Sequence, residues 1–242
     1  MDIVVDLNIL RGDHFPNIEN SNIVIPLLLI IELLNSESIT EDGKITLLKK
    51  IIQRNYKIDM RHPRTIFCDF LGIENKDQKI YNIFLNKLFC ANEISIDNCK
   101  DLIEWNKDAA KKNDKSFTDH DFSKVLKLDI YRDNIKKIKP DIKKSLIFAI
   151  INEIKRLLVE NFLLENNVDF NNCVLSHSLD VYYSVMAYYH FFYATEGRPK
   201  RNDFTDINYM LYLDKNRKFF TLDKKISNAL NTVKPELLFS NN

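Results

Sequence analysis

The sequence contains little glycine, proline or cysteine. With 4 glycines and 6 prolines in 242 residues, few tight turns and long helices are expected. The 4 cysteines form no Cys-x-x-Cys pair, so we expect buried free thiols and no cysteine-based zinc or redox site. Neither a Gly-x-Gly-x-x-Gly nor a P-loop motif occurs, which disfavours folds that bind a nucleotide cofactor.

No hydrophobic segment is long enough to cross a bilayer. The longest run, Ile23 to Ile31, is interrupted by Pro26 and followed by Glu32. No basic segment precedes an apolar one at the N-terminus, so no signal peptide is visible and a cytoplasmic protein without a membrane partner is expected. The formal net charge of +1 does not by itself predict a polyanionic partner.

Short hydrophobic runs at both ends of the chain predict strands, whereas the middle has helical periodicity. Strands are expected at Ile3–Val5, Asn22–Ile25 and Phe219–Leu222, with an edge strand at Val233–Phe239. Helices are expected at about 27–35, from Pro140 onward, at 178–195, at Asp203–Asp214 and at Lys224–Leu230.

The arrangement of these elements predicts an α/β fold with a parallel sheet. Strand–helix units at 1–40 and 170–242 would form one core, and 41–169 would be a helical insertion packed on it. A capping box at Thr118-x-x-Asp121 supports a helix within this insertion. The tyrosines of the helix at 178–195 share one stripe and are interpreted as core.

Acidic residues follow two of the predicted strands, Asp6 after the first and Asp223 after the last. In open parallel sheets ligands bind beyond the carboxyl ends of the strands, so both acids would face one crevice if their strands are neighbours. The alternative is that each aspartate caps the helix or turn that follows it.

Three further acids belong to the same hypothesis. Glu32 is the only charge in a helix that is otherwise apolar, and a buried carboxylate needs a cation or strong hydrogen bonds. The alternative places it on an exposed stripe. Asp203 and Asp206 lie three residues apart on one face of a helix start, where the helix dipole alone also favours acids.

Carboxylates gathered in this way would repel one another unless some are protonated or a cation neutralises them. Oxygen ligands suit Mg²⁺ or Mn²⁺, which would activate water and offset charge on a scissile phosphate. Thr221, two residues before Asp223, and Asn8, two residues after Asp6, are candidates to orient the acids or the water.

These residues resemble the PIN-like domain of metal-dependent nucleases, a family that includes the VapC-type toxin ribonucleases. The similarity covers about 1–35 and 197–240 and lies in Val5-Asp6-Leu7-Asn8, Ile31-Glu32-Leu33, Asn202-Asp203-Phe204-Thr205-Asp206 and Phe220-Thr221-Leu222-Asp223. Asp206 precedes Asp223 by 17 residues, which makes it the better match to the family's helix aspartate. Asp203 is similar to an additional acid of some larger members.

The resemblance implies a three-layer α/β/α fold in which Asp6, Glu32, Asp206 and Asp223 bind the metal, with Asp203 assisting. It implies phosphodiester cleavage, usually of RNA, so an endoribonuclease of a toxin–antitoxin or phage-defence system is expected. Many members form dimers, and some are inhibited by an antitoxin protein. Two alternatives remain: a nuclease of this fold that acts on DNA, and a non-catalytic adaptor that binds RNA or protein.

Basic residues indicate where nucleic acid would bind. Residues 107–156 hold 14 Lys and Arg against 8 Asp and Glu, a net charge of +6, although a lysine-rich composition alone would produce solvated lysines there. Arg198, Lys200 and Arg201 precede the acids of the helix at Asp203 and are candidates for phosphate contacts. The alternative is a polar surface loop.

Overall fold

The computed structural model describes residues 1–15, 19–90, 94–95, 97, 100, 104, 140–169, 173–195 and 203–239. Arg198, Lys200 and Arg201 therefore lie outside the described residues, as do the capping box at Thr118 and most of the basic segment 107–156. Their predicted roles stay predictions.

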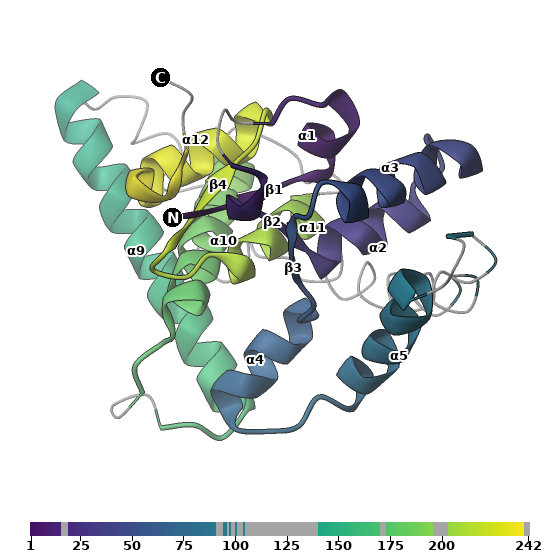
Figure 1. Ribbon diagram of the computed structural model, residues 1–242. Coiled ribbons are helices and arrows are strands. Elements are labelled where there is room, and N and C mark those ends of the chain that lie inside the picture. The colour runs from purple at the N-terminus through teal and green to yellow at the C-terminus, as the bar shows by residue number, and fades with distance from the viewer. Residues whose placement is uncertain are drawn as a thin grey trace.

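A four-stranded sheet, in which all neighbouring strands run parallel, forms the centre of the fold (Figure 1). Its strands are β1 (Asp2–Val5), β2 (Ile23–Pro26), β3 (Lys57–Asp59) and β4 (Arg217–Phe220), in the order β3-β2-β1-β4. Strand β1 therefore lies between β2 and a strand from the far end of the chain. The α/β class predicted from the sequence is confirmed.

Both faces of the inner strands are covered. Ile3, Val4 and Val5 each have 0% of their surface exposed, although consecutive side chains of a strand point to opposite faces. The residues of β2 are buried in the same way. A near-continuous β-branched run is typical of a parallel strand packed on both sides, and it explains why these two strands could be predicted.

Helices connect and cover the strands. The α-helices are α1 (Leu7–Gly12), α2 (Leu27–Asn35), α3 (Glu41–Gln53), α4 (Pro63–Leu71), α5 (Lys76–Cys90), α9 (Pro140–Glu165), α10 (His177–Thr195), α11 (Asp203–Asn208) and α12 (Lys224–Val233). The short 3₁₀ helices are η1 (Asn20–Asn22), η4 (Tyr209–Tyr212) and η5 (Pro235–Leu237). Helix α10 packs against α9, α11, α12 and η4, which joins the long helices to the site region.

Several predicted elements differ in the structure. The strand predicted at Phe219–Leu222 begins and ends two residues earlier, at Arg217–Phe220. Strand β3 lies within 41–169, so the prediction of an entirely helical insertion is wrong at Lys57–Asp59, whose three residues pair with β2. The helix predicted to reach Asp214 ends at Asn208 and continues as η4. The predicted edge strand near the C-terminus is reduced to one bridge between Phe219 and Leu238 after η5.

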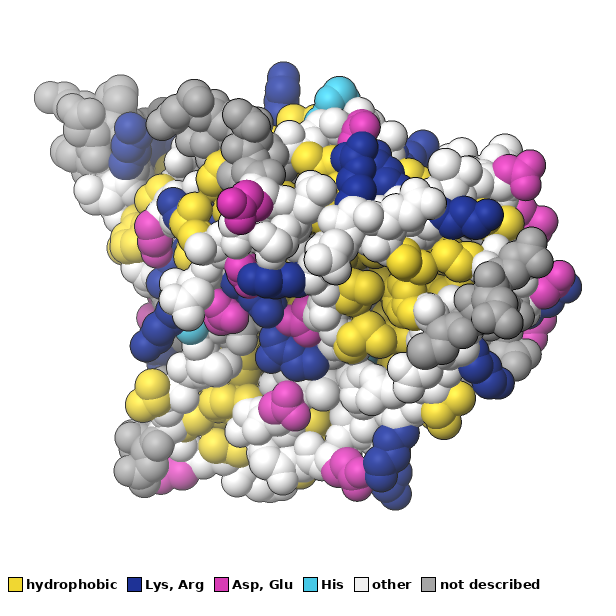
Figure 2. All heavy atoms as spheres, in the orientation of Figure 1, with side chains coloured by type: hydrophobic (Ala, Val, Ile, Leu, Met, Phe, Trp, Pro, Cys, Tyr) yellow, Lys and Arg dark blue, Asp and Glu magenta, His cyan; other side chains and the backbone are white. Residues whose placement is uncertain are grey.

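Charged side chains of both signs are interspersed over much of the face shown in Figure 2. Hydrophobic side chains gather to the right of centre in the same view. Cys68 and Cys173 are free thiols as predicted, but only Cys68 is buried, whereas Cys173 is half-buried. None of the helices among the described residues combines the length and the apolar character needed to span a membrane.

A buried ion pair ties β3 to β4. The Asp59 carboxylate, with 5% of the side chain exposed, accepts hydrogen bonds from Arg217 at 2.6 Å and from Arg61 at 2.6 and 2.9 Å. Burial raises the pKa of Asp59, but the hydrogen bonds from the two guanidinium groups outweigh it and hold this pKa below its ordinary value.

Asp59→Asn should therefore destabilise the fold, because it leaves the largely buried Arg217 with only the longer ion pair to the half-exposed Asp214, at 3.3 Å, and removes the partner of Arg61. We expect the free energy of unfolding in urea to fall by about 3 kcal/mol. Lys57→Gln is the matched control, since it breaks the more exposed Lys57–Asp2 pair and should cost less than about 1 kcal/mol. Equal losses in the two variants would contradict this assignment.

Candidate active site

The pairing of β1 with β4 brings two side chains to one level at the carboxyl edge of the sheet. Val5 lies opposite Phe220, so the following residues, Asp6 and Thr221, leave the sheet together. The Thr221 hydroxyl donates a hydrogen bond to the Asp6 carboxylate. Its oxygen also accepts the backbone N–H of Asp223 at 3.0 Å. One threonine side chain thus links the two acids that follow the strands.

Both acids also cap helices. Asp6 accepts the backbone N–H of Ile9 at 3.0 Å, and Asp223 accepts those of Lys225 and Ile226 at 2.7 and 3.2 Å. The capping alternative from the sequence is therefore correct as geometry. It does not exclude a second role, because an ionised carboxylate accepts about four hydrogen bonds or ligands.

Glu32 lies on α2, about one and a half turns beyond the end of β2. Its carboxylate accepts a hydrogen bond from the hydroxyl of Tyr209, a side chain that is 1% exposed. The pKa of Glu32 is raised to about 8, chiefly by burial and also by the charges of Asp206 and Asp6, against the hydrogen bond from Tyr209. Glu32 is therefore within electrostatic range of acids from two other segments.

Asp206 on α11 interacts with the same acids. Burial raises the pKa of Asp206 to about 7, and the charges of Asp223, Asp203 and Asp6 act in the same direction. Burial likewise raises the pKa of Asp6, against its hydrogen bonds from Thr221 and from the backbone. We call Asp6, Glu32, Asp203, Asp206 and Asp223 the acidic cluster. The structure brings all five into one electrostatic neighbourhood.

Asp203 differs from the other members because it has a cation of its own. Its side chain is buried and accepts hydrogen bonds from the Tyr193 hydroxyl and from the Lys225 ammonium, the latter at 2.6 Å. Lys225 also donates to the Tyr193 hydroxyl at 2.8 Å. Asp203 thus holds Lys225 in place. The sequence predicted Asp203 only as an assisting metal ligand and did not predict this ion pair.

The sequence singled out some of these residues and missed others. Asn8 was predicted to orient the acids, but the Asn8 side chain is exposed on α1. The contact of Asn8 with Asp6 is made by the Asn8 backbone N–H. Tyr209, Tyr193 and Lys225 were not predicted. The one available signal for Lys225 was its position two residues after Asp223.

The oxygen donors of the acidic cluster match the ligands that Mg²⁺ or Mn²⁺ prefers and Zn²⁺ does not. Within the described part of the chain, however, no three His, Cys, Asp or Glu side chains lie close enough together to hold a metal ion as they stand. Binding would require Asp6, Glu32, Asp206 and Asp223 to draw closer around the ion.

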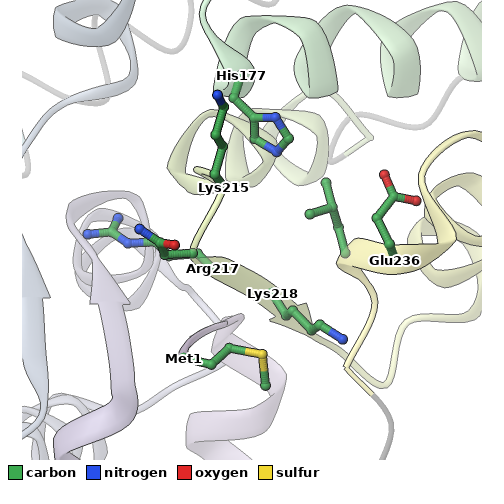
Figure 3. Close-up of a pocket in the computed structure, with 8 residues that line it drawn as sticks. Met1, His177, Lys215, Arg217, Lys218 and Glu236 are labelled. Carbon is green, nitrogen blue, oxygen red and sulfur yellow. The ribbon is translucent and has the colours of Figure 1, made fainter.

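A hollow of about 800 Å³ lies at the opposite, amino end of the strands (Figure 3). Its lining residues include Lys215, Lys218, His177 and a single acid, Glu236, and Figure 3 shows the Lys215 side chain beside His177. Arg217 also borders the hollow, but its guanidinium is bonded to Asp59. This hollow offers cationic contacts without grouped carboxylates, so it does not provide the chemistry that the acidic cluster does.

The raised pKa values of Glu32 and Asp206 predict that stability falls as pH rises. Between their ordinary values of 4.5 and 3.8 and their folded values of about 8 and about 7, the folded protein binds more protons than the unfolded chain. The free energy of unfolding must decrease with pH across this window. We expect thermal unfolding followed by circular dichroism in EDTA to give a lower Tm at about pH 8 than at about pH 5.

Glu32→Gln should remove part of this dependence, because glutamine cannot ionise but still accepts the hydrogen bond from Tyr209. The Tm of the variant should exceed that of the wild type by about 3 °C at high pH and by little at low pH. Glu37→Gln, at an exposed position, should follow the wild type. A Glu32→Gln variant that keeps the full pH dependence would refute the role of burial at Glu32.

Comparisons with known proteins found no relative from which a function could be transferred. No family model matches the chain. No curated protein matches it either, and no solved structure does. Function is therefore inferred from the residues of the acidic cluster and from the sheet edge that positions them.

Proposed function

We propose that this protein is a Mg²⁺- or Mn²⁺-dependent nuclease with a PIN-like fold, and that it cleaves RNA internally. One observation supports the proposal above all. Acids from four separate segments, after β1, on α2, on α11 and after β4, act on one another's ionisation at the carboxyl edge of a parallel sheet. This edge is where open α/β sheets bind ligands.

Each residue has a role that follows from its contacts. Asp6, Glu32, Asp206 and Asp223 would hold the cation, which when bound would activate water and offset charge on the phosphate. Thr221 keeps Asp6 and the backbone of Asp223 in a fixed relation, and Tyr209 orients Glu32. Neutralisation by a divalent cation would offset the cost of ionising the half-buried Glu32 and Asp206.

The proposal extends to partners. The basic segment 107–156 and Arg198, Lys200 and Arg201 would bind the RNA backbone. We also propose a role in a toxin–antitoxin or defence system, in which a protein partner would inhibit the nuclease. The protein would assemble as a homodimer. The insertion at 41–169 would pack on the PIN-like core while supplying β3 to its sheet.

A second candidate is a non-catalytic adaptor that keeps the PIN-like fold and binds RNA or protein. It is favoured by the spread of the carboxylates, no three of which converge on one point within the described residues. Against it, groups of repelling acids lower stability and have no evident use unless a cation binds them. A nuclease of the same fold that acts on DNA is the remaining alternative.

Asp6→Asn and Asp223→Asn should each abolish metal-dependent RNA cleavage. Asparagine keeps the size and an acceptor oxygen but loses the charge that a divalent cation needs, so we expect the single-turnover rate in Mn²⁺ to fall by about a thousandfold or more. Asp42→Asn, which removes an exposed acid on α3, is the matched control and should cleave like the wild type.

The same assay separates the alternatives. Wild-type cleavage of DNA in preference to RNA would identify the DNA-directed nuclease. Absence of cleavage of either substrate at any Mg²⁺ or Mn²⁺ concentration would support the adaptor. Normal cleavage by both aspartate variants, with unchanged thermal unfolding, would show that the acidic cluster is not the active site.

A further inference from the structure

Lys225 occupies an enclosed position beside the acidic cluster. It lies in the first turn of α12, and its backbone N–H bonds the Asp223 carboxylate. Its ammonium donates to Asp203 and to the Tyr193 hydroxyl. It also lies 5.1 Å from the ring centroid of Tyr189, 5.7 Å from that of Phe192 and 4.6 Å from that of Tyr193. A lysine held from so many sides has little freedom to move.

The ammonium group nevertheless has capacity for a ligand. One quarter of the Lys225 side chain is exposed. Of its three N–H donors, two are used by Asp203 and Tyr193, and the third has no acceptor among the described contacts. The charge of Lys225 lowers the pKa of Asp206 against burial and the neighbouring acids, so the ammonium lies within electrostatic range of a proposed metal ligand.

Tyr189 supplies an independent observation. Its side chain is 1% exposed, and its hydroxyl has no hydrogen-bond partner among the residues that the structure describes. Burial raises the pKa of Tyr189, and the charges of Asp206, Asp203 and Asp223 raise it further, so the hydroxyl lies beside the acidic cluster. A buried hydroxyl without a partner costs about 1–3 kcal/mol, and a ligand oxygen at this position would remove that cost.

We propose that Lys225 and Tyr189 form an anion subsite that binds a phosphate oxygen of the RNA backbone next to the acidic cluster. Asp203 and Tyr193 are positioning residues that hold the ammonium in place. The subsite deepens the proposed function, on which the choice of RNA as ligand rests. It also explains how a polyanion can approach five acids, because a fixed positive charge lies among them.

The test measures RNA binding without cleavage. A short fluorescein-labelled single-stranded RNA is titrated with protein in EDTA, and the Kd is followed by fluorescence anisotropy over a range of salt concentrations. Lys225→Met keeps the length of the side chain and removes its charge. We expect it to weaken binding about tenfold and to reduce the slope of log Kd against log salt by about 0.7, the value for one single-strand phosphate contact.

Lys224→Met is the matched control, because Lys224 is an exposed neighbour on the same helix and its loss changes the net charge equally. It should bind nearly as the wild type does. Lys225→Arg should restore the salt slope. Tyr189→Phe should weaken binding about fivefold with the slope unchanged, because the hydroxyl carries no charge.

Lys225→Met leaves the buried Asp203 without its counter-ion and would lower stability. The double variant Asp203→Asn/Lys225→Met removes both charges and provides a folded form in which to measure binding. The proposal is overturned if Lys225→Met binds RNA as Lys224→Met does, if the double variant binds as Asp203→Asn alone does, or if the wild type binds no RNA. A wild type that binds RNA with the expected variant pattern but cleaves none would refute the nuclease and leave the subsite intact.

Discussion

The parallel pairing of β1 with β4 is the interaction on which the site depends. It joins the first and last strands of the described residues and places Asp6 and Thr221 level at one edge. Every further contact of the cluster is built on that register: Thr221 bonds Asp6 and the backbone of Asp223, and Asp223 in turn starts the helix that carries Lys225. A slip of one residue would turn these side chains to the opposite face of the sheet and separate them.

The five acids are held in two different ways. Asp6, Asp203 and Asp223 receive hydrogen bonds from a hydroxyl, an ammonium or helix N–H groups, which compensate an ionised carboxylate for lost water. Glu32 and Asp206 have less compensation, and their pKa values are raised to about 8 and about 7, chiefly by burial. The three acids that are fixed in this way would provide a template for a cation, and a bound cation would favour the ionised forms of Glu32 and Asp206.

Much of the fold could be predicted because its signals are local. The β-branched runs predict β1 and β2, and the apolar run predicts α2. Asp6 and Asp223 could be singled out because each comes shortly after a predicted strand. Strand β3 could not be predicted, because Lys57-Ile58-Asp59 is short and becomes a strand only by pairing with β2. Tyr209 was missed for the same reason: it bonds a residue 177 positions away, and no periodicity reports such a contact. The contacts of Lys225 could not be predicted either, because Asp203 and Tyr193 lie on other helices and meet Lys225 only in the folded protein.

The position of β1 between β2 and β4 has a consequence for biosynthesis. The strand is synthesised before both of its partners, and one of them, β4, follows it only after about two hundred residues. Until then Asp6 has neither Thr221 nor Asp223 beside it. The acidic cluster therefore cannot assemble until β4 has been synthesised and has paired with β1.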